Sequence, residues 1–172
     1  MNEKGVGLIE VIIVVVIIGI ATMIAIPNFQ SWLAYQYLRG DAAQIEGDLQ
    51  AARITAINEN VPVTVLFVPA SNQYYAFIDD GRGAGGVARD LTLNGTEPKL
   101  FTRTLTSGDS LAFTNNTQTN YNCLTNGTGT ALLFNSKGLL GFPAAWCVNV
   151  TSGTVTRNHT VAVTLAGAIS VK

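Results

Sequence analysis

The stretch Lys4-Gly5-Val6-Gly7-Leu8-Ile9-Glu10 leads into an apolar segment that ends at Ile26-Pro27. The 21 residues from Val6 to Ile26 match the ~20 that an α-helix needs to cross ~30 Å of hydrocarbon, and residues 11–26 carry no charge. Glu10 is unusual in such a segment, because an ionised carboxylate inside lipid costs about 2.5–3.5 kcal/mol on insertion scales. The stretch therefore predicts a transmembrane helix whose acidic residue has a function and a partner.

Two simpler interpretations of the segment fit it less well. A secretory signal peptide has an apolar core of only ~7–15 residues and a small-x-small cleavage site, and Ala25-Ile26-Pro27-Asn28 is a poor site. A plain signal anchor fits the length but leaves Glu10 unexplained. Lys4, just before the apolar run, favours a cytoplasmic N-terminus and an exported C-terminus.

The spacing of Gly5, Glu10 and Pro27 resembles the class III signal of type IV prepilins and type II secretion pseudopilins. Such signals have a short leader that ends in Gly, followed by an apolar helix with Glu fifth and often Pro twenty-second. Cleavage after Gly5 would place Glu10 fifth and Pro27 twenty-second. The resemblance implies that residues 1–5 are a leader removed by prepilin peptidase, that Val6 is then N-methylated, and that residues 6–27 form the transmembrane and filament-core helix.

Glu10 then acquires a physical role in assembly. Removal of the leader would leave the α-amine of Val6 as a cation at the edge of the bilayer. When helices pack in a staggered bundle, Glu10 of one subunit can pair with that amine on a neighbour. Removing one partner of a buried pair typically costs ~3–5 kcal/mol, so Glu10 is predicted to recruit the subunit into a filament and not to catalyse a reaction.

The second half of the helix is predicted to be amphipathic. Pro27 lies inside what we expect to be one long helix and predicts a bend there, whereas Pro62 marks the stop beyond the expected amphipathic half, residues 28–58. Apolar residues recur at spacings of three and four, which predicts one stripe laid on the domain's own sheet. The stripe consists of Tyr35, Leu38, Ala42, Ile45, Leu49, Ala52 and Ala56.

After Asn60 the apolar period becomes alternating, which predicts strands. Val61–Val68 and Gln73–Ile78 are expected to form a hairpin. Further strands are expected at Leu91–Leu93, Lys99–Leu105, Ser110–Phe113, Ala131–Phe134, Cys147–Val150, His159–Leu165 and Ala168–Val171. Residues 59–172 are thus expected to form one β-rich domain, and the fold class is α+β, with the long helix packed on an antiparallel β-sheet or β-sandwich.

Composition argues against several kinds of function. From Asn28 onward nine Lys/Arg balance nine Asp/Glu, so bulk charge does not favour nucleic acid as a partner. The chain has one histidine, His159, and no CxxC motif, so neither a catalytic thiol nor a metal pair has supporting ligands. Cys123 and Cys147 are therefore predicted to form a structural disulfide in an exported chain, and no cofactor or enzymatic activity is expected.

Residues 79–86 form a glycine-rich loop. It lacks the Lys-Ser/Thr pair of a phosphate-binding loop. Asp79, Asp80 and Asp90 were considered as calcium ligands, but they lack the alternate spacing of an EF-hand, so no metal site is predicted and calcium stays the alternative. A flexible hairpin tip is the preferred interpretation.

Beyond the signal, the chain resembles the GspH/FimT group of minor pseudopilins and minor pilins. Leu49–Val63 is similar to that group's helix-to-strand junction, and Tyr74–Asp80 to its aromatic strand and Asp-bearing turn. Phe134–Gly138 and Val161–Val171 are similar to later segments. DNA-binding members carry a Gly-Arg-x-Arg motif near the C-terminus, where Ala166-Gly167-Ala168-Ile169-Ser170 has no arginine, which does not favour DNA uptake.

The resemblance implies a structural minor subunit of a type II secretion pseudopilus or of a type IV pilus. A pilus-tip binding module, for DNA uptake or adhesion, and a major pilin are the alternatives. The implied partners are other pilins or pseudopilins in a helical filament, prepilin peptidase and the inner-membrane assembly platform. The implied location is the inner membrane, crossed once, with the C-terminal domain in the periplasm, and afterwards the pilus or pseudopilus.

Overall fold

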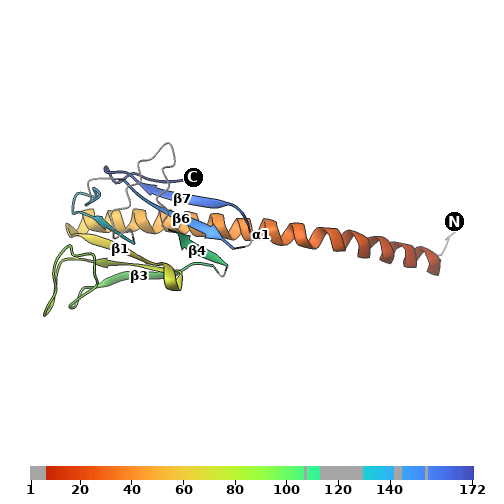
Figure 1. Ribbon diagram of the computed structural model, residues 1–172, viewed down its shortest axis with the longest axis horizontal. Coiled ribbons are helices and arrows are strands. Elements are labelled where there is room, and N and C mark those ends of the chain that lie inside the picture. Colours follow the sequence, from red (N-terminus) through yellow and green to blue (C-terminus); the bar gives the residue numbers. More distant parts are fainter. Residues whose placement is uncertain (1–6, 107, 113–129, 142–144, 154) are drawn as a thin grey trace, which may run out of the picture.

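The computed structural model describes residues 7–106, 108–112, 130–141, 145–153 and 155–172, and it shows one long helix beside two antiparallel sheets (Figure 1). One sheet has the strand order β3-β2-β1-β5 and the other β4-β6-β7-β8. The elements are α1 (Leu8–Glu59), β1 (Val63–Val68), the 3-10 turn η1 (Pro69–Ser71), β2 (Gln73–Ile78), β3 (Lys99–Thr104), β4 (Asp109–Ala112), β5 (Ala131–Phe134), β6 (Trp146–Ser152), β7 (Asn158–Val163) and β8 (Ile169–Val171). The predicted α+β class is confirmed.

α1 continues without interruption through Pro27, and only its C-terminal half is covered by strands (Figure 1). The helix ends one residue beyond the predicted end, where Asn60 takes a left-handed conformation with φ 55°. That conformation reverses the chain and lets the N–H of Val61 bond the carbonyl of Ala56 at 3.2 Å. The bend at Pro27 stays a prediction.

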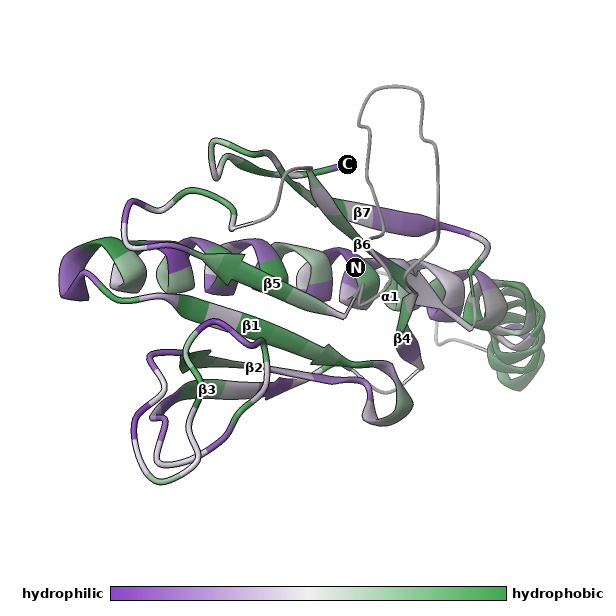
Figure 2. Ribbon diagram, turned by 60° about the vertical axis from the view of Figure 1, so that its left-hand side comes forward, coloured by the Kyte–Doolittle hydropathy of each residue, from purple (hydrophilic) through white to green (hydrophobic). Residues whose placement is uncertain are grey.

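The predicted apolar stripe is confirmed as the face of α1 that packs on the strands. Six of its members are fully buried: Leu38, Ala42, Ile45, Leu49, Ala52 and Ala56. Tyr35, the first member, is only half-buried, because it lies where the head ends and the uncovered half of α1 begins. Both sheets contact α1, the first through β1 and β5 and the second through β6, β7 and β8 (Figure 2).

Aromatic rings join the two sheets in the core. The ring of Phe67 in β1 stacks on Tyr74 of β2 with centroids 5.3 Å apart, and it lies 5.0 Å from Trp146 of β6 in the other sheet. The Tyr74 hydroxyl donates to Asp48 of α1 at 2.7 Å, and Nε of Arg103 in β3 reaches the same carboxylate oxygen at 3.2 Å. Burial, followed by the bond to Asp48, raises the pKa of the Tyr74 hydroxyl far above its usual value. This contact therefore fixes the helix against β2 and β3 with the tyrosine neutral.

The strand predicted at Leu91–Leu93 is wrong. Leu91 has φ 65°, and its N–H donates to the carboxylate of Asp79 at 3.1 Å instead of to a neighbouring strand. Asp79 is fully buried and also accepts from the Thr64 hydroxyl at 2.8 Å. A buried carboxylate must have its oxygens satisfied, and here backbone N–H groups of the loop satisfy them, so residues 79–98 wrap around it in place of pairing as a strand.

The same loop contains a second buried carboxylate. Glu97 accepts the N–H groups of Gly81 and Asn94, each at 3.0 Å. The loop connects β2 to β3, as a hairpin tip should, and the two carboxylates accept backbone N–H groups along it. The flexibility of this tip stays a prediction.

A pair of buried acids joins α1 to the start of β4. Asp41 accepts the N–H and the hydroxyl of Thr106 at 2.7 and 2.9 Å. Asp109 is 4% exposed, and its Oδ2 accepts no hydrogen bond from the described residues. Burial raises the pKa of the Asp109 carboxyl, a bond with Ser152 lowers it, and the neighbouring charge of Asp41 raises it again. The net effect is a raised pKa, so ionised Asp109 destabilises the folded head.

Asp109→Asn should therefore stabilise the protein near neutral pH. Because the folded-state pKa of Asp109 lies above the unfolded value of about 3.9, wild-type stability falls as the pH rises from ~4 through the folded-state pKa. The amide does not ionise, so the variant's gain in free energy of unfolding should be larger at pH 7 than at pH 4, measured by urea unfolding of the detergent-solubilised chain. Asp90→Asn is the control, since turn hydrogen bonds lower the pKa of Asp90 and its substitution should not stabilise. A gain that is equal at the two pH values would contradict the assignment.

Candidate assembly site

The N-terminal half of α1 is an apolar rod with nothing covering it. In the described part of the chain, α1 is the one helix long and apolar enough to cross a membrane, with a mean hydropathy of 3.0 in its most apolar window and none of that window buried. Leu8 and Met23, near its two ends, are each 81% exposed. In Figure 2 the ribbon of this half is coloured almost entirely as hydrophobic. Soluble proteins rarely expose a contiguous apolar surface of this extent, so lipid or other helices must cover it.

Glu10 is the acidic residue of the first helical turn, and its side chain is exposed on the rod. The helix begins after Gly7, whose carbonyl accepts the N–H of Glu10 at 3.0 Å, and no side chain caps it. A carboxylate at this position interacts favourably with the positive end of the helix dipole. Among the described residues no cation pairs with Glu10. Gly5 and Val6, the predicted processing site, lie outside the described residues.

A shallow hollow of about 210 Å³ lies beside Glu10 on this rod. Val11, Val14 and Val15 line it together with Glu10. A neighbouring helix could pack its apolar side chains into this hollow, with the Glu10 carboxylate at its edge. In lipid, a carboxylate there is much less costly when a cation on the neighbour meets it.

The polar residues within and just after the apolar half bond to the helix itself. The Thr22 hydroxyl donates to the carbonyl of Ile18 at 2.7 Å, and the Asn28 amide donates to Ile24 at 3.4 Å. Such i to i−4 bonds satisfy side chains that would otherwise need water. They leave Glu10 as the polar group of this half that still needs a partner from another molecule.

Three segments that carry the family resemblance meet around Arg53. Its Nε donates to the carbonyl of Gly138 at 2.8 Å, and its Nη2 donates to the carbonyl of Ala166 at 3.2 Å. The first acceptor follows β5, and the second lies in the turn between β7 and β8. Arg53 therefore holds both loops against the end of α1, which gives this residue of the Leu49–Val63 junction a structural role.

Each of the three calcium candidates already has a partner within the β2–β3 loop. The Asp79 carboxylate accepts the N–H of Leu91, Asp80 forms an ion pair with Arg82, and Asp90 accepts the N–H of Thr92 at 2.9 Å. Within the described ranges, no group of three or more potential metal ligands occurs, and loop donors already bond to these carboxylates. Cys147 lies in β6 and is disulfide-bonded, whereas Cys123 lies outside the described residues, so the Cys123–Cys147 pairing stays a prediction.

One hollow was not predicted from the sequence. It lies between α1 and the β6–β7 turn and brings Tyr35 next to Arg157. Those two residues are far apart in the sequence; Tyr35 belongs to the predicted apolar stripe, and Arg157 belongs to no motif. A single arginine in a polar turn does not by itself predict a site, and only the fold places Arg157 beside α1.

A long helix with a bare apolar half and an antiparallel β head defines a type IV pilin-like protein. Residues 41–167 match the family described as "Type II transport protein GspH", and residues 1–26 match the "Prokaryotic N-terminal methylation motif". The chain belongs to the GspH family, whose fold is that of structural pilins, and the predicted resemblance is confirmed.

Relatives of known description agree with this assignment. A "Fimbrial protein" of Pseudomonas aeruginosa is 31% identical over 114 residues, which cover 63% of this chain and 73% of that protein. The type IV minor pilin FimU of Pseudomonas aeruginosa has a similar structure, with a TM-score of 0.55 and 14% identity over 80% of this chain and 90% of that one. The minor pseudopilin EpsH of the Vibrio cholerae type 2 secretion system gives a TM-score of 0.52 and 13% identity, over 78% and 95% of the two chains. At these identities the two structures show a shared fold.

Proposed function

We propose that the protein is a minor pseudopilin or minor pilin, a structural subunit processed between Gly5 and Val6 by prepilin peptidase and assembled into a filament through Glu10. The observation that carries the proposal is the uncovered apolar half of α1 with one carboxylate in its first turn. An apolar helix surface of this extent is unfavourable in water. It suits a subunit that is stored in a membrane and whose apolar half then packs against the same half of neighbouring subunits.

The assembly step follows from the position of Glu10. Once the leader is removed, the α-amine of Val6 is the new N-terminus, four residues before Glu10 in the sequence. In a staggered bundle the Glu10 carboxylate of one subunit meets the Val6 amine of the next, and the valines beside Glu10 pack against the neighbour's apolar side chains. N-methylation keeps the charge of the amine. The pair directs the stagger because both charges are buried only when the helices are in register.

The proposed location is the inner membrane, crossed once by residues 6–27, with residues 28–172 in the periplasm. Lys4 before the apolar run supports this orientation. The proposed partners are other pilins or pseudopilins, prepilin peptidase and the assembly platform. The proposal assigns no catalytic activity and no nucleic acid to the head, in keeping with a family of structural pilins.

Processing is tested by the mass of the chain isolated from membranes of a host with prepilin peptidase. The mature chain should begin at Val6 and carry one additional methyl group, as shown by intact mass and N-terminal sequencing. Gly5→Val should retain residues 1–5, because the peptidase would no longer meet the glycine before the cleavage site.

Gly7→Ala is the matched control for that experiment. A Cβ on Gly7 would meet only ordinary contact, with Ile9 Cγ2 3.8 Å away, so this variant should be processed normally. A wild-type chain that still begins at Met1 would refute the proposed processing.

A further inference from the structure

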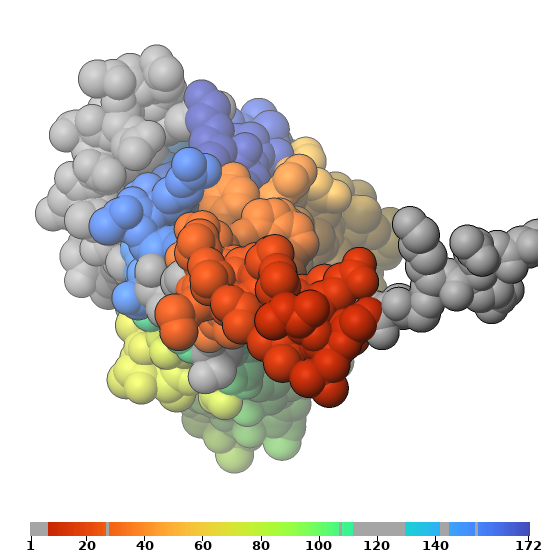
Figure 3. Space-filling model, turned by 90° about the vertical axis from the view of Figure 1, so that its right-hand side faces the viewer, coloured from red at the N-terminus to blue at the C-terminus, as the bar shows by residue number. Residues whose placement is uncertain are grey.

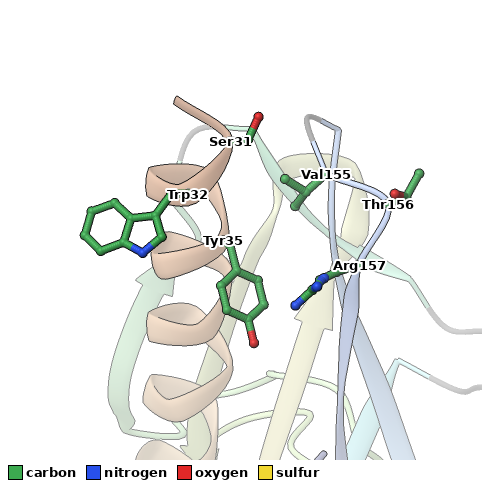
Figure 4. A pocket seen from close by; sticks show the side chains of 6 residues that line it. All are labelled: Ser31, Trp32, Tyr35, Val155, Thr156 and Arg157. Atoms are coloured by element: carbon green, nitrogen blue, oxygen red, sulfur yellow. The ribbon is translucent and has the colours of Figure 1, made fainter. Parts of the chain in front are cut away.

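A hollow of about 490 Å³ lies at the end of the head nearest the apolar half of α1 (Figure 4). It is lined from α1 by Ser31, Trp32 and Tyr35, and from the β6–β7 turn by Val155, Thr156 and Arg157. In the view from the N-terminal end, the β6–β7 turn (blue) lies beside the orange part of α1 (Figure 3). The hollow is therefore placed where the head would meet a membrane crossed by α1.

Arg157 is held in this hollow by an aromatic ring. Its guanidinium lies 5.0 Å from the centroid of the Tyr35 ring, and Figure 4 shows the two side chains pointing toward one another. The Tyr35 ring also lies close to the His159 ring, with centroids 5.8 Å apart. Within the described part of the chain, no carboxylate pairs with Arg157. A guanidinium positioned in this way keeps its five N–H donors for an outside acceptor.

The surroundings of the hollow are cationic. Residues 28–40 contain Arg39 and no acid, and residues 153–172 contain Arg157 and Lys172 and no acid. The nearest acids along the adjoining elements, Asp41 and Asp109, are buried in the head. The side chains of these two segments therefore contribute positive charge and no carboxylate to this end of a nearly neutral domain.

The hollow begins at the outer edge of the headgroup layer of a bilayer. Ser31 and Trp32 follow Ile26 by five and six residues, or about 8–9 Å of helix, and Tyr35 follows by nine, or about 13–14 Å. The headgroups add ~5–8 Å to each side of the hydrocarbon core, which places Arg157, beside Tyr35, just outside them. Phe29 and Trp32 are 59% and 53% exposed, with ring centroids 5.7 Å apart. Aromatic residues are enriched at this depth in membrane proteins, which agrees with the apolar rod ending just below.

We propose that this hollow binds the phosphate of an anionic phospholipid in the leaflet beneath the head. The guanidinium of Arg157 supplies the bidentate donors that a phosphate prefers. Docking in this way holds the head at one orientation over the membrane before the subunit is extracted. The inference rests on the proposed membrane insertion of α1, and it goes beyond that function by naming the lipid class and the residue that binds it.

The test uses the full-length chain in nanodiscs of phosphatidylcholine, with or without phosphatidylglycerol. Hydrogen–deuterium exchange of the β6–β7 turn, residues 153–157, should be slower in the discs that contain phosphatidylglycerol. Arg157→Gln should reduce this protection about fivefold, the factor expected for one arginine near an anionic bilayer. Arg89→Gln is the matched control, because Arg89 is an exposed arginine in the β2–β3 loop at the far end of the head, and it should keep the protection.

The outcomes separate the lipid site from the function on which it rests. A chain that does not co-elute with nanodiscs would contradict the proposed membrane subunit. A chain that co-elutes but is protected equally in the two kinds of disc would overturn the lipid site alone. Equal loss of protection in Arg157→Gln and Arg89→Gln would show that the effect comes from net charge, and this would also overturn the lipid site. Protection that appears only at high subunit density would assign the hollow to a neighbouring pilin instead.

Discussion

Glu10→Ala should abolish incorporation of the protein into filaments while leaving its insertion into the membrane unchanged. The alanine variant keeps the whole apolar half of α1, whose length and hydropathy decide insertion. It leaves the Val6 amine of a neighbour without its carboxylate in a place without water. An unpaired buried charge costs about 3–5 kcal/mol, which corresponds to a loss of more than about a hundredfold in the affinity of a subunit for the growing filament.

The measurement compares the amount of protein in sheared filaments with the amount in carbonate-washed membranes. Glu10→Asp should be intermediate, because it keeps the charge on a shorter side chain. Glu59→Ala is the matched control, since it removes an exposed carboxylate from the other end of the same helix. Incorporation of Glu10→Ala at the wild-type level would remove the assembly role assigned to Glu10.

Gly167→Ala, in the turn between β7 and β8, should strongly destabilise the head. Gly167 has φ 74°, and a Cβ there would lie 2.1 Å from the carbonyl oxygen of Gly138 and 2.8 Å from Nε of Arg53. Neither group can move away freely, because Arg53 donates to that same carbonyl at 2.8 Å. The left-handed conformation costs about 1–2 kcal/mol and the overpacking about 1–3 kcal/mol, so a total near 2–5 kcal/mol is expected.

Thermal unfolding of the detergent-solubilised chain measures this effect. For a chain of this size, each kcal/mol lowers the midpoint by about 2–4 °C. Gly85→Ala separates the two contributions, because Gly85 has φ 79° but nothing within 4 Å of its added Cβ. It should show only the conformational part. Equal shifts for the two variants would mean that the contact between Arg53, Gly138 and Gly167 does not constrain the fold.

The stability of this junction also explains why the resembling segments are spread along the chain. Leu49–Val63 contains Arg53, and the two loops that it bonds follow β5 and connect β7 to β8. The similarity of these segments to a family is visible in the sequence, but their meeting point is not. These hydrogen bonds of Arg53 indicate that the resembling segments are needed for packing of the head and not for binding a ligand.

Much of the helix could be read from the sequence. The uninterrupted apolar run, the apolar stripe after it and the stop before Pro62 are local patterns, and their outcome depends on residues within a few turns. Most strands were also located to within two residues, because alternation is a local property. The strand predicted at Leu91–Leu93 is wrong because of a residue outside that segment. The N–H of Leu91 donates to the buried carboxylate of Asp79 and therefore lies in a turn.

The sequence by itself determined that this protein has a membrane-length helix with one acid in its first turn, since hydropathy, length and the spacing from Gly5 to Glu10 depend on consecutive residues alone. Only the tertiary structure decided the two-sheet order, the paired burial of Asp41 and Asp109, and the hollow where Tyr35 holds Arg157. These features join residues that are distant in the chain. Their energies come from packing and desolvation, which exist only once the strands have closed around α1.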